Sequence, residues 1–175
     1  DRILALTGTR ERPTREAFEK YQRINFTLNS LDRLEVRGRD SCGIQVLLQF
    51  ENHRELKKVL DTIKAARLYD EFLERCSPGD LWDRSIHIAP ESIAFTYKTA
   101  LITGDLGDNT RRLRSSIGGD GVLHAALEGC PDSQMYLVHT RWASVGAINE
   151  ANCHPVNNFT LTGDPPGQFD YGTTR

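Results

Sequence analysis

Apolar side chains recur at intervals of three and four residues over two long stretches of the chain, 14–35 and 52–75. On a helix this spacing puts them on one face, so both stretches predict an amphipathic helix. Thr14, just after Pro13, is a residue type that caps helix N-termini. The apolar positions are Ala17, Phe18, Tyr21, Ile24, Leu28, Leu31 and Leu34 in the first stretch, and Leu56, Val59, Leu60, Ile63, Ala66, Phe72 and Leu73 in the second. Shorter helices are predicted over 111–117 and 122–127.

Three other segments have the composition or the alternation of β-strands. Residues 43–50 alternate Ile44, Val46, Leu48 and Phe50 with mostly polar neighbours, which predicts a strand with one face in the core. Residues 92–102 are rich in β-branched and aromatic side chains, and 134–140 form another short apolar run. Helices and strands therefore follow each other along one domain of 175 residues, and the order predicts an α/β or α+β fold.

Composition narrows the range of partners. The hydrophobic share is 38% and the charged share 26%, values typical of a globular domain. The net charge is −2 with both signs mixed along the chain, so we expect neither nucleic acid nor an anionic membrane as a partner. No apolar run approaches the ~20 residues of a membrane span. The chain opens without a signal-peptide pattern, so we expect a cytoplasmic location.

Neither the cysteines nor the histidines are spaced like metal ligands. Cys42, Cys76, Cys130 and Cys153 contain no CxxC pair, so we interpret them as reduced thiols. The five histidines form no HxxxH pair, and we expect neither a metal nor a cofactor. Cys42 has two interpretations: a reactive thiol near Arg37 and Arg39, or a small buried residue at the start of a strand.

Two glycine-rich segments resemble phosphate loops only superficially. "GDLGDN" (104–109) and "GGDG" (118–121) lack the lysine and hydroxyl of a phosphate loop and the complete GxGxxG pattern. We interpret both as turns.

Arg141 stands directly after the predicted strand 134–140, with Trp142 beside it. An arginine fork matches a carboxylate in a bidentate pair, and the rim of a sheet is a frequent place for ligands. Trp142 offers a flat wall or a lid for such a ligand. Taken alone, Arg141 is better interpreted as half of a surface ion pair.

Two segments together resemble the class II glutamine amidotransferases, in particular the glutaminase domain of glucosamine-6-phosphate synthases. "LDRLEVRGRDSCGIQV" (31–46) is similar to the family's LxxLEYRGYDSAG, and "HTRWASVGAINEANCHP" (139–155) is similar to HTRWATHG followed by NAHP. The resemblance covers about a fifth of the chain. It implies an α+β fold of the Ntn-hydrolase type, a four-layer αββα sandwich. The segment at about 51–100 would be a mainly helical insertion.

The resemblance also implies a function in amino-sugar biosynthesis. In the family, an N-terminal cysteine attacks the side-chain amide of glutamine, ammonia leaves for an acceptor such as a sugar phosphate, and water releases glutamate. By this resemblance, Arg141 would bind the α-carboxylate of glutamine, and Trp142, Ser144 and His154 would shape the pocket. Arg37 and Asp40 would support the surroundings of the nucleophile. The implied partners are glutamine and an ammonia-acceptor domain or subunit such as a sugar isomerase, and the resemblance also allows a homo-oligomer.

The chain departs from the family at several positions. It begins Asp1-Arg2, without the nucleophilic cysteine, which we expect upstream of Asp1; no Asn-Gly oxyanion pair follows Pro155. Val145 replaces a family histidine. Cys42-Gly43-Ile44 would serve as the family's Cys-Gly-Ile start only after cleavage behind Ser41. Three interpretations stay open: the chain is incomplete at both ends, it is a non-catalytic glutamine-sensing module, or it is a different protein.

Overall fold

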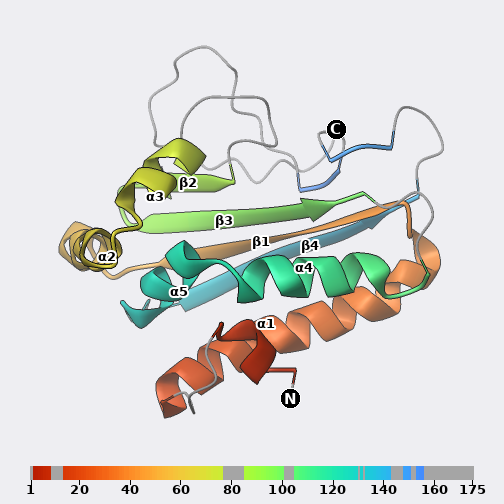
Figure 1. Cartoon of the computed structure of the whole chain (residues 1–175), viewed down its shortest axis with the longest axis horizontal. Coiled ribbons are helices and arrows are strands. Elements are labelled where there is room, and N and C mark those ends of the chain that lie inside the picture. Colours follow the sequence, from red (N-terminus) through yellow and green to blue (C-terminus); the bar gives the residue numbers. More distant parts are fainter. Residues whose placement is uncertain are drawn as a thin grey trace.

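The computed structural model describes residues 2–8, 14–76, 85–100, 105–129, 131, 133–142, 148–150 and 153–155. Within them, a four-stranded antiparallel sheet has the order β2-β3-β1-β4 (Figure 1). Its strands are β1 (Ser41–Gln49), β2 (Ile86–Ala89), β3 (Ser92–Thr99) and β4 (Ser133–Arg141). The antiparallel pairing makes this an α+β protein and excludes the parallel α/β alternative.

Helices cover one face of this sheet. α1 (Arg15–Leu34), α4 (Asp108–Gly118) and α5 (Gly121–Glu128) lie on the same side of it (Figure 1). The strands direct their alternate residues toward these helices, which forms the apolar core. Fully buried residues of the strands and of α1 and α4 include Ile44, Val46, Leu48, Ile93, Phe95, Ile24, Leu28, Leu31 and Ile117. Thr14 accepts a hydrogen bond from the Ala17 N–H and begins α1, as predicted.

The segment 52–75 is two helices rather than the single one predicted. α2 (His53–Ala65) and α3 (Tyr69–Cys76) are separated by a turn in which Arg67 has a φ of 61°. A left-handed residue breaks the helical hydrogen-bond ladder, and the apolar spacing continues across it because both helices bury one face. The short strand β2 and the 3-10 turn Leu4–Leu6, which buries Leu6, were not predicted.

Residues 51–100 contribute both strands of the sheet and helices beside it. They supply α2 and α3, but also β3, which pairs with β1 from Cys42↔Thr99 to Gln49↔Ser92. The described part of this segment is therefore a mixture of helix and strand, and one of its strands lies against the centre of the sheet. None of the described helices combines the length and the apolar character that a membrane crossing requires.

The second face of the sheet is partly open. Met135 and Leu137 of the edge strand β4 are 56% and 42% exposed, although both pair with residues of the central strand β1. On the same face, Gln45 of β1 donates to Thr96 of β3 at 3.0 Å. This face therefore carries both apolar and hydrogen-bonded polar side chains.

Candidate functional site

The two segments that carry the sequence motifs meet where β1 begins and β4 ends. Ser41 is the register partner of Arg141, and Gly43 is the partner of His139. The Asp40 N–H donates to the Arg141 carbonyl at 3.1 Å. A Cβ on Gly38 would lie 2.7 Å from the Arg141 carbonyl carbon and 2.9 Å from the Trp142 nitrogen, so only glycine permits this close approach. We call this region the motif junction.

The first motif is also anchored to α4. Glu35, in the 3-10 turn Glu35–Arg37, is 1% exposed and accepts hydrogen bonds from the Gly107 N–H and from the Thr110 N–H and hydroxyl, the last two at 2.9 and 2.8 Å. Its carboxylate thus caps the N-terminus of α4. The side chain of Asn109, also buried, donates to the Arg39 carbonyl at 2.8 Å. These contacts fix the loop that precedes β1.

Two histidines face each other at the motif junction. The rings of His139 and His154 lie edge to face with centroids 4.4 Å apart. Burial, followed by the charges of neighbouring groups, lowers the pKa of both histidines, and Arg141 is among those neighbours for each. Arg141 and His139 are two residues apart on β4 and so share a face of the sheet. The junction therefore combines one permanent positive charge with two imidazoles whose pKa values are lowered.

The structure brings together some of the predicted site residues. Arg141, His154 and the backbone of Asp40 belong to the motif junction. Trp142 follows Arg141 directly and is 71% exposed, so in this structure it does not cover a pocket. Arg37 is exposed in the 3-10 turn. Ser144 lies outside the described residues.

The described cysteines are poor nucleophiles. Cys42 and Cys153 are buried, and burial raises the pKa of both thiols. Burial also raises the pKa of Cys76, to about 11. The Cys153 thiol lies 3.1 Å from the Cys42 carbonyl oxygen. Of the two interpretations of Cys42, the structure favours the buried residue.

Gly43 allows the segment around His154 to lie directly on β1. A Cβ on Gly43 would overlap the His154 carbonyl oxygen and stand 3.0 Å from Pro155 Cδ. We predict that Gly43→Ala displaces this segment and exposes the His154 ring. The pKa of His154, which burial lowers, should then rise toward the ordinary value of about 6.5.

The measurement is an NMR pH titration of the histidine ring protons. Gly119→Ala serves as the control, because its Cβ would meet nothing closer than 3.4 Å. An unchanged pKa of His154 in the Gly43→Ala variant would show that His154 does not depend on this close contact.

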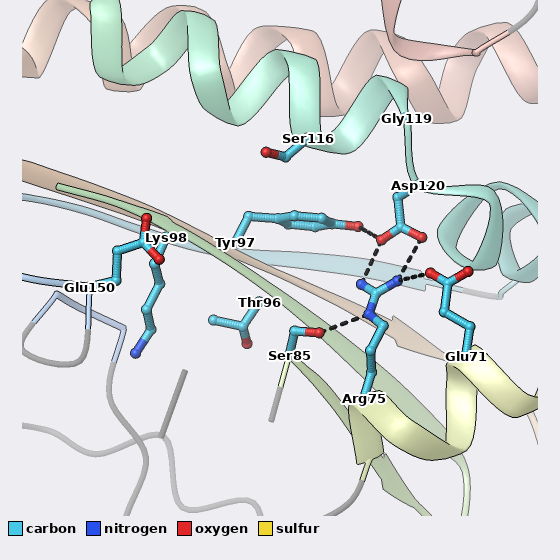
Figure 2. Close-up of a pocket in the computed structure, with 10 residues that line it drawn as sticks. All are labelled: Glu71, Arg75, Ser85, Thr96, Tyr97, Lys98, Ser116, Gly119, Asp120 and Glu150. Atoms are coloured by element: carbon cyan, nitrogen blue, oxygen red, sulfur yellow. Dashed lines mark hydrogen bonds and ion pairs between the residues drawn. The ribbon is translucent and has the colours of Figure 1, made fainter. Parts of the chain in front are cut away.

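A separate pocket lies beside the part of β3 that extends past β2. The β2 pairing ends at Ile86↔Phe95, followed by one hydrogen bond of 2.7 Å from the Thr96 N–H to the Ser85 carbonyl. The pocket has a volume of about 350 Å³ and is lined by charged and hydroxyl side chains (Figure 2). Its described lining consists of Glu71, Arg75, Ser85, Thr96, Tyr97, Lys98, Ser116, Gly119, Asp120 and Glu150.

A polar network centred on Asp120 forms one wall of this pocket. Its carboxylate accepts two hydrogen bonds from Arg75, at 2.9 and 2.7 Å, and one from the Tyr97 hydroxyl at 2.5 Å (Figure 2). It also accepts from the Leu123 N–H at 3.0 Å and so caps α5. Burial alone would raise the pKa of Asp120, but the hydrogen bonds and charge of Arg75 outweigh it and lower that pKa. Asp120 therefore stays ionised and joins α3, β3 and α5.

The predicted site residues and this pocket do not coincide. None of Arg37, Asp40, Arg141, Trp142 and His154 is among the described residues that line the pocket. Sequence analysis did not single out Arg75, Lys98 or Asp120 as site residues.

Of Arg75, Lys98 and Asp120, only Asp120 has a role that its neighbours in the sequence indicate. It precedes the apolar segment 122–127, as a helix cap does. Its partner Arg75 stands 45 positions away. Comparison with family models, with curated proteins and with solved structures finds no match for this chain.

Proposed function

We propose that this chain is a glutaminase-type domain that binds glutamine at the motif junction. The observation that carries the proposal is the meeting of the two motif segments. Residues about a hundred positions apart become direct partners, with Ser41 opposite Arg141 and the His154 segment lying on Gly43. Two unrelated short matches would have no reason to converge on one end of a sheet. Their convergence supports a shared binding site.

The charges of the motif junction suit the α-carboxylate of an amino acid. Arg141 supplies a guanidinium, which pairs with carboxylates in a bidentate manner. Because burial lowers the pKa of His139 and His154, these rings add hydrogen-bonding capacity at neutral pH without adding charge. In the proposal, Arg141 binds the α-carboxylate, and His154 and Trp142 shape the pocket for the rest of the glutamine molecule.

The buried cysteines constrain the proposed mechanism. Cys42, Cys76 and Cys153 have raised thiol pKa values, so none of them is suited to attack an amide. The proposal therefore assigns this attack to a different thiol, the N-terminal cysteine of the family. The ammonia released would pass to an acceptor domain or subunit, with a sugar phosphate as the expected acceptor.

The open face of the sheet supports the finer proposal for the fold. An Ntn-hydrolase sandwich has two sheets stacked between helical layers. The described sheet has helices on one face, whereas Met135 and Leu137 are exposed on the other. We propose that a second sheet packs on this face, because sheets stack through apolar side chains such as these.

Replacing Arg141 with lysine tests glutamine binding at the motif junction. The substitution keeps the charge but removes the planar fork. We predict that the dissociation constant for L-glutamine rises about tenfold to 150-fold, the equivalent of ~1.5–3 kcal/mol for a charge-assisted hydrogen bond. Isothermal titration calorimetry measures this change. Arg33→Lys, on an exposed position of α1, is the matched control and should bind glutamine like the wild type.

Equal glutamine affinity in the Arg141→Lys and Arg33→Lys variants would refute the assignment of Arg141. Ammonia release from glutamine then separates the two functions that share this site. Release of ammonia by the complete protein supports the amidotransferase, whereas binding without release supports a glutamine-sensing module.

A further inference from the structure

The pocket beside β3 contains charges that its internal network does not neutralise. Arg75 donates to Asp120, to Ser85 at 2.8 Å and to Glu71 at 3.2 Å, so its guanidinium is already occupied. The charges of Arg75 and Asp120 cancel. Lys98, Glu71 and Glu150 remain around the pocket, one positive and two negative side chains.

Lys98 is the most unusual of these groups. It is partly buried, and burial lowers its pKa, while the charge of Glu150 counteracts this effect. Within the described residues, no acceptor lies at hydrogen-bond or ion-pair distance from its ammonium group. Figure 2 shows Lys98 and Glu150 at one end of the pocket and the Arg75 cluster at the other. Among the described residues that line the pocket, therefore, none pairs with this ammonium group.

The wall of the pocket away from Lys98 carries negative charge. Ser116 and Gly119 come from the C-terminal end of α4, where the helix dipole places partial negative charge. Glu71 adds a carboxylate at this end, whereas Glu150 lies beside Lys98 at the other end (Figure 2). A ligand that is only anionic would face these two carboxylates, and a ligand that is only cationic would face Lys98. A dianion such as phosphate fits poorly, because Arg75 is already engaged.

We propose that this pocket binds a free amino acid, with its carboxylate at Lys98 and its ammonium group toward Glu71 and the end of α4. A volume of about 350 Å³ lies at the lower end of the range for ligand pockets, which suits a small molecule. Hydroxyl groups of Ser116 and Thr96 offer further hydrogen bonds. This site adjoins the motif junction, because Lys98 is the register partner of Gly43 and its charge contributes to the lowered pKa of His154. The proposal does not depend on glutamine binding at the junction.

The test is an NMR titration of the protein with three small probes. L-Alanine carries both charges, propionate only the carboxylate, and ethylamine only the ammonium group. We expect L-alanine to shift the amide resonances of Thr96, Lys98 and Gly119 in a saturable manner, and each single-charge probe to bind at least tenfold more weakly. Equal binding of propionate or ethylamine, or no shift at these amides, would overturn the proposal.

Variants then separate this pocket from the motif junction. Lys98→Met keeps the apolar stem and removes a charge that no described residue pairs with, and we expect it to weaken L-alanine binding at least tenfold. Glu71→Gln, at an exposed position of the other end, is expected to weaken binding as well, and thermal unfolding verifies that both variants fold. Lys57→Met, an exposed position on α2, should leave L-alanine binding unchanged. Binding that survives in Lys98→Met but is lost in Arg141→Lys would move the amino acid to the motif junction and refute this second site.

Discussion

Asp120→Asn is expected to lower the free energy of unfolding by about 3–5 kcal/mol, the usual cost of breaking a buried ion pair by removing one partner. Asp120 accepts from Arg75, Tyr97 and Leu123, and it is 6% exposed. The variant removes the buried counter-ion of the Arg75 guanidinium and leaves only the half-exposed Glu71 as its partner, and it weakens the cap of α5 at the same time. Urea denaturation followed by circular dichroism measures the change.

Asp61→Asn is the matched control for this ion pair. Asp61 is exposed and lies 3.9 Å from Lys64 on the surface of α2, so its loss should cost less than about 1 kcal/mol. A similar small loss for Asp120→Asn would mean that the Asp120 network does not stabilise the fold.

Asp120→Asn also tests how the stabilisation contributed by Asp120 depends on pH. Arg75 holds the pKa of Asp120 below its usual range, whereas in the unfolded chain this pKa is about 3.9. The stabilisation is therefore fully present above the unfolded pKa and is lost as the pH falls toward the folded pKa. We expect the difference between wild type and Asp120→Asn to be constant between about pH 7 and pH 5 and to shrink at lower pH. A difference that grows on acidification would contradict this explanation.

Glu35→Ala is expected to destabilise the protein by about 2–4 kcal/mol, since it removes a helix cap and leaves buried donors unpaired. The donors are the N–H groups of Gly107 and Thr110 and the Thr110 hydroxyl. Because Glu35 also fixes the loop before β1, the variant should loosen the motif junction. Urea denaturation measures the first effect and glutamine affinity the second.

Two further substitutions define what Glu35 contributes. Glu35→Gln keeps one side-chain oxygen as an acceptor and should lose less stability than Glu35→Ala. Glu74→Ala, at an exposed position of α3, should change stability by no more than about 0.5 kcal/mol. Equal stability of Glu35→Ala and Glu74→Ala would rule out a capping role for Glu35.

The elements of the fold were predictable where one face of a long segment is apolar. The helix over 14–35 and the strand from 43 agree with α1 and β1, because burial of one face leaves a periodic pattern in the sequence. β2 has only four residues, too few for its alternation to be distinctive. The break between α2 and α3 depends on Arg67 in a left-handed conformation, and a residue other than glycine gives no local signal for it.

The candidate site was predictable only in part, for a related reason. Motifs identify Arg141 and His154 because their neighbours in the sequence are specific. The partners of Asp120 come from α3 and β3, far from it in the sequence, and nothing local indicates that Arg75 and Tyr97 will converge there. Lys98 is one of five lysines in the sequence, and only the folded pocket distinguishes it by burial and by the lack of an ion pair among the described residues.

The pairing of β1 with β4 closes a loop of about a hundred residues, from Ser41 to Arg141. Closing so long a loop costs chain entropy before the contacts between the two strands stabilise the fold. We therefore expect this pairing to form late in folding. During synthesis, β1 leaves the ribosome long before its partner exists. A partly synthesised chain therefore has no competent motif junction, and a ligand bound there would stabilise only molecules that have completed this closure.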